Sequence, residues 1–407
     1  LQGSRLTESD FKKLFSIEPL KHLQLMDLGE TGMTSKGIKH LCVSKWLKCL
    51  GILSLSNNNL DDEGIFFLSK TTCLPSLTSL DLSSNEVGAL GVKALSLSTS
   101  LSNLDSLNLS YNRIEPLGIH ALANSTFGQR LKTLKLCDTC LGNEGVEELA
   151  RYSLKELEFV DLSENSISEA GIETLAKSKT FPKLKKLVLN NNHIGDDGIY
   201  ALSQSDMFCN LEALFLVNND LTTDSAISIS KSEILTQLKI LDFNNNDIRA
   251  EGTRALSESP NLDSLQSLDL GQNRLGPGGA KALSESSNMK SLKFLRLNNN
   301  NICDTGTAAL AKSKYFGALE SLLLENENWI HAEGAKSLAS SKAFPLLRQL
   351  VLTLNAIGDD GACYLAEAKN FTALEQLNVA GNKISPKGED ALRNSPNLQH
   401  LKILELV

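Results

Sequence analysis

The segment LKKLVLNNNHIGDDGIYAL, residues 184–202, contains the pattern that decides the fold. It has the form Leu-x-x-Leu-x-Leu-x-x-Asn-x-Ile, with a glycine four residues after the isoleucine. Leu187 and Leu189 alternate with other residues at a period of two, which predicts a short strand with one buried face. Ile199 and Leu202 lie three residues apart after the glycine, and they predict the buried side of a short helix.

This pattern recurs along the chain with a mean spacing of 27 residues. One unit buries apolar side chains worth roughly 10–20 kcal/mol. Ordering its backbone costs about 1–2 kcal/mol for each residue, so a single unit cannot fold alone and the units must stack. The asparagine falls at residues 58, 85, 112, 165, 192, 219, 246, 273, 300, 328, 355 and 382, and Thr31 and Thr139 take its place in two further units.

The sequence therefore predicts an α/β solenoid of about 14–15 repeats, shaped as a horseshoe. Because helices are wider than strands, the parallel sheet is expected on the concave face and the helices on the convex face. Residues 1–19 are expected to form an N-terminal helical cap or a degenerate repeat, and residues 20–407 the solenoid. The last repeat is expected to be truncated, with further segments of the protein beyond both ends.

Three kinds of side chain have an expected role in each unit. The asparagine is expected to bond backbone groups at the end of the strand, so that stacked asparagines form a ladder. Carboxylates such as Asp61 and Asp196 stand where they can cap the helix that follows. A partial spine of phenylalanines is expected in the core: Phe181, Phe208, Phe316, Phe344 and Phe371.

The composition disfavours several classes of function. Forty basic against 48 acidic residues leave a net charge of −8, which argues against a nucleic-acid partner. No apolar run approaches the length needed to span a bilayer, so no membrane association is expected. The eight cysteines are too sparse for a disulfide scaffold and predict reduced thiols in the cytoplasm.

The repeat is identified as a leucine-rich repeat, and its helical segments resemble the ribonuclease-inhibitor-like class. Closer still, Gly91-Val92-Lys93-Ala94-Leu95 and two similar segments at residues 279–283 and 334–338 resemble the GALA-type repeats of bacterial effectors. The resemblance covers residues 20–407 and implies an effector acting in the cytoplasm of a host cell. GALA proteins usually add an F-box, and since none is recognisable here, recruitment of a ubiquitin ligase is not implied.

A second resemblance, to the Ran GTPase-activating proteins, implies a different function. Those proteins carry a functional arginine, and Arg113 and Arg274 stand beside the repeat asparagine in loops. Both can equally be solvated surface residues, and the acidic tail of that family is absent. A GTPase-activating or other regulatory enzyme role through edge loops remains the alternative. The repeat regions of intracellular immune receptors are a third resemblance.

No motif of a catalytic or metal site is present. Cys137 and Cys140 have redox or half-zinc spacing, but no second pair of ligands completes a zinc site. The histidines are scattered over different units, and no phosphate-binding loop or dinucleotide fingerprint occurs. We therefore expect no catalytic residue, no metal, no cofactor and no small-molecule substrate.

Two groups of apolar residues are expected on the concave face, where polar residues are usual. The charged residues Asp161, Asp242, Asp269 and Arg296 stand between and around them. Apolar anchors with a charged rim predict a protein interface, but the same residue types also simply suit strands. The first group is Phe159, Val188, Phe215, Val217 and Ile240, and the second is Phe294, Leu323, Val351 and Leu354.

One repeat carries an extra residue near Trp329, in the segment ENENWIH at residues 325–331. The insertion is expected to bulge the turn and display the indole, either as a binding feature or as a neutral change. The sequence as a whole predicts a non-catalytic recognition module that binds a protein partner on its concave face, and it does not identify that partner.

Overall fold

The computed structural model describes residues 1–406. Its contacts divide the chain into two compact units. Unit 1 is Leu1–Ile194 with Ser205–Leu211, and unit 2 is Gly195–Gln204 with Glu212–Val407.

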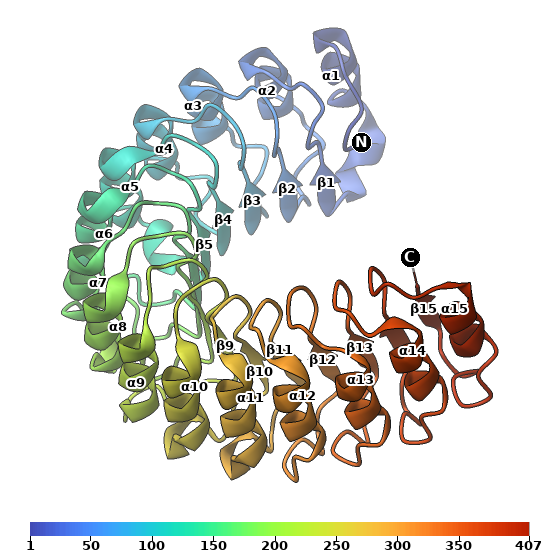
Figure 1. Cartoon of the computed structure of the whole chain (residues 1–407). Helices are drawn as coiled ribbons and strands as arrows, with labels where there is room; N and C mark the ends of the chain where they lie inside the picture. The colour runs from blue at the N-terminus through green and yellow to red at the C-terminus, as the bar shows by residue number, and fades with distance from the viewer. Residues whose placement is uncertain (407) are drawn as a thin grey trace. The chain divides into compact units, whose positions relative to one another are not determined.

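Unit 1 alternates short helices with strands of three residues each (Figure 1). Its helices are α1 (Glu8–Leu14), η1 (Glu18–His22), α2 (Ser35–Cys42), α3 (Asp62–Lys70), α4 (Ala89–Ser96), α5 (Glu115–Ala123), η2 (Gly128–Arg130), α6 (Gly142–Ala150), α7 (Glu169–Ala176) and η3 (Asp206–Phe208). Its strands are β1 (Leu25–Asp27), β2 (Ile52–Ser54), β3 (Ser79–Asp81), β4 (Ser106–Asn108), β5 (Thr133–Lys135), β6 (Phe159–Asp161) and β7 (Lys186–Val188).

Unit 2 repeats the same alternation. Its helices are α8 (Gly195–Ser203), α9 (Thr223–Lys231), α10 (Arg249–Glu258), η4 (Pro260–Leu262), α11 (Gly276–Glu285), η5 (Ser287–Met289), α12 (Cys303–Ala311), α13 (Ala332–Ala339), α14 (Gly358–Ala366) and α15 (Pro386–Arg393). Its strands are β8 (Ala213–Phe215), β9 (Ile240–Asp242), β10 (Ser267–Asp269), β11 (Phe294–Arg296), β12 (Ser321–Leu323), β13 (Gln349–Val351), β14 (Gln376–Asn378) and β15 (Ile403–Glu405).

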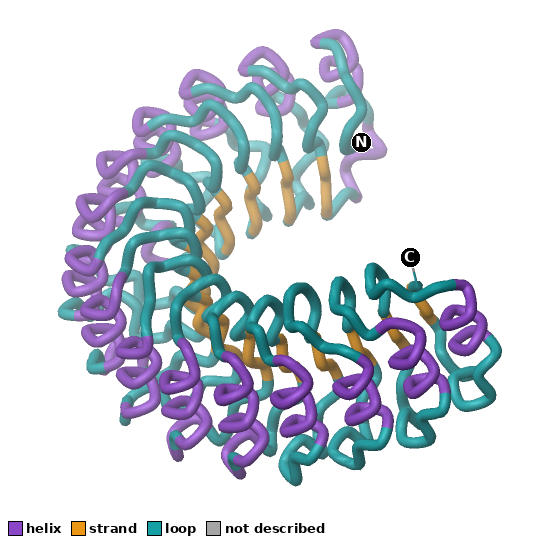
Figure 2. Tube along the Cα trace, viewed as in Figure 1, coloured by secondary structure: helices purple, strands orange, loops and turns teal. Residues whose placement is uncertain are grey.

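Within each unit the strands form a parallel sheet in chain order, and equivalent residues of successive repeats lie side by side. In unit 1, for example, Leu53 pairs with Leu80, and in unit 2, Leu268 pairs with Leu295. The strands line one side of each unit and the helices line the other (Figure 2). The predicted solenoid of strand–helix repeats is therefore confirmed.

The repeat asparagines form the expected ladder. The side-chain amide of Asn300, which is fully buried, donates to the carbonyl oxygens of Leu270 and Asn298 at 2.7 and 3.1 Å. Its Oδ1 accepts from the backbone N–H groups of Asn273 and Leu275 at 2.9 and 3.2 Å. Each asparagine thus satisfies buried backbone groups of its own repeat and of the preceding one, which ties neighbouring repeats together.

The phenylalanine spine is also confirmed, since all five predicted residues are buried. In unit 2, the rings of Phe316 and Phe344 stack with centroids 6.2 Å apart. The helix glycines have a different role, because they allow close packing of neighbouring helices. A Cβ at Gly306 would clash with Ile302 and would lie 3.1 Å from Ala280 on the neighbouring helix α11.

Helix capping follows the prediction in part. Asp61 caps its own helix α3 by accepting from the N–H of Gly64 at 3.0 Å. Asp62 instead accepts from Gly88 and Gly91 at the start of α4, at 2.7 and 2.8 Å. Because successive helices begin side by side, a carboxylate in the first turn of one helix reaches the unsatisfied N–H groups of the next.

Candidate functional site

Each strand presents two of its three side chains on one side of the sheet, and we call this side the strand face. In β11, Leu295 is buried in the core while Phe294 and Arg296 lie on the strand face, each half-buried. Because equivalent residues are in register, the strand face of each unit consists of rows of side chains that run across the strands.

In unit 1, the predicted residues Phe159 and Asp161 lie at the two ends of β6. The ring of Phe159 lies between two lysines of the neighbouring strands, with the Nζ atoms of Lys135 and Lys186 at 5.9 and 4.7 Å from its centroid. The carboxylate of Asp161 accepts from the Ser163 hydroxyl at 2.6 Å. An aromatic ring flanked by cations therefore lies next to an acidic side chain.

Two valines differ from the sequence-based expectation. Val188 and Val351 were expected to be exposed, but each is only 8% exposed. Val351 is in register with the longer side chains of Leu323 and Asn378 on the neighbouring strands. Val188 is in register with Asp161. A short branched side chain at such a position is covered by its longer neighbours, so neither valine offers much surface.

The first predicted apolar group is divided between the units. Phe159 and Val188 belong to unit 1, whereas Phe215, Val217 and Ile240 belong to unit 2. In unit 2, Phe215 ends β8 and is in register with Asp242, and Ile240 begins β9. All three of these residues in unit 2 are half-buried.

The charged residues of unit 2 form a cluster on β9, β10 and β11. Asp242, Asp269 and Arg296 occupy the same position on the three adjacent strands. The guanidinium of Arg296 lies 2.6 Å from the carboxylate of Glu325 and 3.8 Å from that of Asp269. Arg296 is thus held mainly by Glu325, and Asp242 forms no ion pair within residues 1–406.

This arrangement makes ionisation of the two aspartates unfavourable. Burial raises the pKa of Asp242 to about 6, and the negative charge of Asp269 adds to the effect. A hydrogen bond from the N–H of Asn244 and the charge of Arg296 oppose the rise without cancelling it. Burial raises the pKa of Asp269 as well.

A second row beside these charges was missed by the sequence analysis. It contains Asn244, Gly271, Asn298 and Glu325. Asn244 donates from its amide to Asp269 at 3.2 Å. The side chains of Asn244 and Asn298 close over Gly271, where a Cβ would clash with both. Their position two residues after each strand end was the available signal, because residues two apart share a face.

The second predicted apolar group lies within unit 2. Phe294 and Leu323 are half-buried on the strand face of β11 and β12. Leu354 lies in the loop after β13 and is 60% exposed. Trp329 is 56% exposed in the loop before α13, as expected from the insertion. Glu327 and Trp329 flank the repeat asparagine with positive φ angles, as residues of other repeats do, and the extra residue adds a further positive φ at Asn326.

The arginines behind the alternative enzyme hypothesis are engaged in surface ion pairs. The Nε of Arg113 lies 2.8 Å from Glu115, and Arg274 lies 3.3 Å from Asp247. Cys137 is buried, and burial is the main cause that raises the pKa of its thiol to about 11, which disfavours the reactive thiolate.

Among the described residues, no group of three or more His, Cys, Asp or Glu side chains is placed to hold a metal ion. Nor does any helix within residues 1–406 combine the length and the apolar character that crossing a membrane requires.

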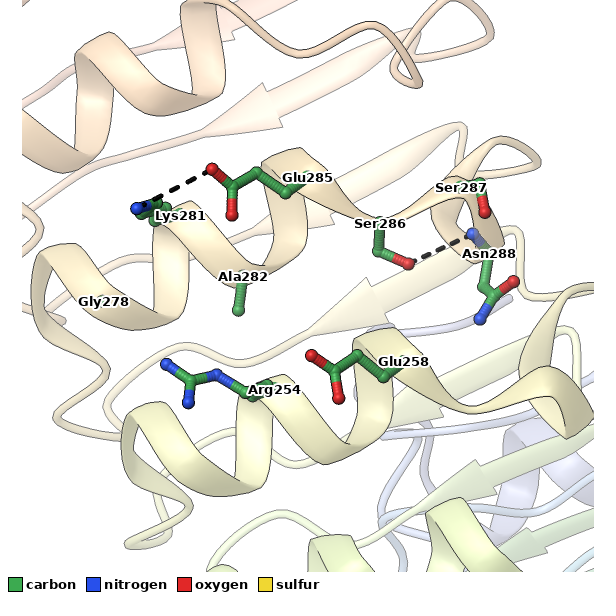
Figure 3. A pocket seen from close by; sticks show the side chains of 9 residues that line it. All are labelled: Arg254, Glu258, Gly278, Lys281, Ala282, Glu285, Ser286, Ser287 and Asn288. Atoms are coloured by element: carbon green, nitrogen blue, oxygen red, sulfur yellow. Dashed lines mark hydrogen bonds and ion pairs between the residues drawn. The ribbon is translucent and has the colours of Figure 1, made fainter.

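One groove, between α10 and α11, is lined by Arg254, Glu258, Lys281 and Glu285 together with small residues (Figure 3). Lys281 pairs with Glu285 at 3.8 Å on the same helix. Charges of both signs and small side chains give this groove no distinct chemical preference.

Comparison with known proteins agrees with the repeat. The family model described as Leucine Rich repeat matches residues 47–69, 73–96, 100–123, 182–203, 235–257, 262–284 and 345–366. No curated protein matches the sequence.

Solved structures share the architecture. The TLR13–ssRNA13 complex is 20% identical with a TM-score of 0.55, over 95% of this chain and 56% of that chain. An internalin (inlF) from Listeria monocytogenes is 20% identical with a TM-score of 0.50, over 99% of this chain and 89% of that chain. A leucine-rich repeat protein of Leptospira interrogans is 21% identical with a TM-score of 0.53, over 94% and 96%.

At these identities the likeness concerns the fold alone, and this chain spans about half the length of the TLR13 chain. The fold is nevertheless consistent across the three structures and with the matched segments. The 27-residue spacing, the strand–helix units and the seven matched segments together make this chain a leucine-rich repeat protein.

Proposed function

We propose that the strand face of unit 2 binds a protein partner, without catalysis. Leucine-rich repeat domains are typically binding modules. The observation that supports this role most is the combination of apolar and charged side chains on four adjacent strands, β9 to β12. Apolar side chains of Ile240, Phe294 and Leu323 stand beside the charged cluster of Asp242, Asp269 and Arg296.

The two kinds of residue have different roles in the proposal. Phe294 and Leu323 are the anchors, because burying large apolar side chains at the centre of an interface supplies most of its free energy. The charged cluster sets the orientation, since a partner that presents cations to Asp242 and Asp269 is favoured over one that presents anions. Trp329 and Leu354 extend the apolar surface into the neighbouring loops.

The strand face of unit 1 is proposed as a second contact region. There Phe159 lies between Lys135 and Lys186, and Asp161 stands at the other end of the strand. Phe215 and Val217 are assigned to the proposed surface of unit 2. Val188 and Val351 are kept only as minor contributors, because little of either side chain is exposed.

We further propose that the chain belongs to the ribonuclease-inhibitor-like subclass and functions in a cytoplasm. Helices of 8–10 residues in most repeats support the subclass, and eight free cysteines support a reducing compartment. The GALA-like segments support an origin as a bacterial effector in a host cell.

The experiment compares partner capture by the full chain and by a double variant, Phe294→Ser with Leu323→Ser. We expect the variant to lose at least about tenfold of its specifically captured protein, as read by quantitative mass spectrometry. The matched control is Leu346→Ser, which removes an exposed leucine outside the strands of unit 2 and should leave capture unchanged. Equal capture by the double variant, with melting temperatures unchanged, contradicts the proposal.

A further inference from the structure

The helix side of unit 1 carries an exposed apolar surface, which we call the leucine surface. Leu90 and Leu97 on and just after α4, and Leu117 on α5, are between 69% and 74% exposed. They line a groove of about 430 Å³ between the two helices, together with Ala89 and Ala121 and the polar residues Lys93, Ser96, His120, Asn124 and Ser125. Single exposed leucines are common, but three around one groove form an apolar cluster.

These leucines have no role in the core of the solenoid. The buried positions of α4 are Val92 and Leu95, and those of α5 include Ile119 and Leu122. Leu90 and Leu117 occupy the same position of their helices, 27 residues apart, and both point away from the core. A polar residue would serve folding equally well there, as Glu144 does one repeat later.

An acidic groove continues the leucine surface toward α6. This second groove, of about 650 Å³, shares Leu117 and His120 with the first. It is lined by four glutamates and one arginine: Glu115, Glu144, Glu147, Glu148 and Arg151.

The ion pairs in this groove leave part of its negative charge unbalanced. Arg151 pairs with both Glu147 and Glu148, at 2.9 and 2.6 Å, and the Nδ1 of His120 lies 2.8 Å from Glu148. Glu115 pairs with Arg113, whereas Glu144 forms no ion pair with any of the described residues. The acidic groove therefore carries an excess of negative charge directly beside an apolar groove.

From this juxtaposition we infer that α4, α5 and α6 bind an amphipathic helix of a protein partner, with apolar residues over α4 and α5 and lysine or arginine over α6. The length of the groove fits such a helix. Leu90 and Leu97 are seven residues apart, so their side chains lie about 10 Å apart along the axis of α4. This spacing matches apolar anchors at positions i, i+3 or i+4, and i+7 of a helix lying in the groove. The site is independent of the strand face proposed above.

The test uses a fluorescein-labelled peptide of about 14 residues built from leucine and lysine in an amphipathic helical pattern. We expect binding to the full chain by fluorescence anisotropy, weakening as salt is added because the glutamates contribute. The double variant Leu90→Ser with Leu97→Ser should bind at least about tenfold more weakly. Glu144→Gln should weaken binding about two- to fivefold and reduce the salt dependence.

Two controls separate the site from general attraction between a cationic peptide and an acidic protein. A peptide of the same composition with its leucines dispersed around the helix should bind at least about tenfold more weakly. Leu346→Ser, far from α4 in the sequence, should bind like the wild type. Equal binding of the two peptides, or unchanged binding by the double leucine variant, overturns the inference.

A further measurement distinguishes a partner's amphipathic helix from a second copy of this chain as the molecule that binds the leucine surface. If sedimentation velocity shows a dimer that Leu117→Ser dissociates, while the amphipathic peptide does not compete with it, the leucine surface is a self-association site and our assignment is wrong. Partner capture by the strand-face double variant, Phe294→Ser with Leu323→Ser, by contrast, tests only the proposed function.

Discussion

Replacing Asp242 by asparagine is expected to stabilise the folded protein at neutral pH. The substitution conserves the size and shape of the side chain. Its amide oxygen can still accept the hydrogen bond that Asp242 receives from the N–H of Asn244, at 2.9 Å. What the substitution removes is a negative charge that is partly buried and lies on the strand next to that of Asp269.

The magnitude follows from the shift of the pKa. Burial, with the charge of Asp269, raises the pKa of Asp242 from 3.8 to about 6 in the folded state. Ionising it therefore costs the folded protein about 3 kcal/mol at pH 7.5. If all 407 residues unfold together, with an unfolding entropy of about 2.1 cal/mol/K per residue, this corresponds to a rise in Tm of about 3–4 °C in the asparagine variant.

The pH dependence has a definite sign. Between pH 4 and pH 6 the folded state binds more protons at Asp242 than the unfolded state does, so its contribution to stability falls as the pH rises. Below pH 4 the carboxyl is protonated in the folded state, and asparagine offers no further advantage. The gain from Asp242→Asn should therefore grow from pH 4 to pH 6 and remain constant above.

Calorimetry of the full chain at several pH values measures this gain, and NMR of the labelled side-chain carboxyl carbon measures the pKa directly. Asp196→Asn is the control, because we expect it to change the stability at neutral pH in the opposite direction. Burial alone would raise the pKa of Asp196, but hydrogen bonds from Ser225 and Thr222 outweigh burial and lower it. Its variant should lose stability at neutral pH. A pKa of Asp242 near 4, or a lower Tm for Asp242→Asn at pH 7.5, would refute the reasoning.

Three further substitutions test the packing of the repeats. Asn300→Ala should lower the free energy of unfolding by about 3–6 kcal/mol in denaturant titrations, because it leaves buried backbone groups without partners. A loss below about 1 kcal/mol would contradict the stabilising role of the asparagine ladder. Gly306→Ala should lower the Tm although alanine is the better helix former, because its Cβ would clash with Ile302. Gly317→Ala, where nothing lies within 4 Å of the added carbon, should not lower it.

Much of the fold could be predicted because the same sequence pattern occurs in many successive units. A buried leucine, an asparagine and a glycine return at nearly constant spacing, and each has one physical role that the neighbouring copies confirm. The capping carboxylates are an exception, because the repeat pattern does not predict which helix each of them caps. Asp61 and Asp62 are adjacent in the sequence, yet one caps its own helix and the other caps the next. Only the offset between stacked helices decides between them.

The surface was less predictable, because exposure depends on the neighbours of a side chain as well as on its own position. Val351 and Leu323 occupy equivalent strand positions, yet Val351 is nearly covered whereas Leu323 is half-buried. The difference arises from the lengths of the neighbouring side chains in the same row. Those neighbours belong to other repeats, so the sequence of one repeat does not reveal them. The same limit applies to the leucine surface. Leu90 and Leu117 resemble core leucines in the sequence, but their positions on their helices direct their side chains away from the core. For a repeat protein, residues that depart from the repeat therefore have to be examined along rows, across successive strands or helices.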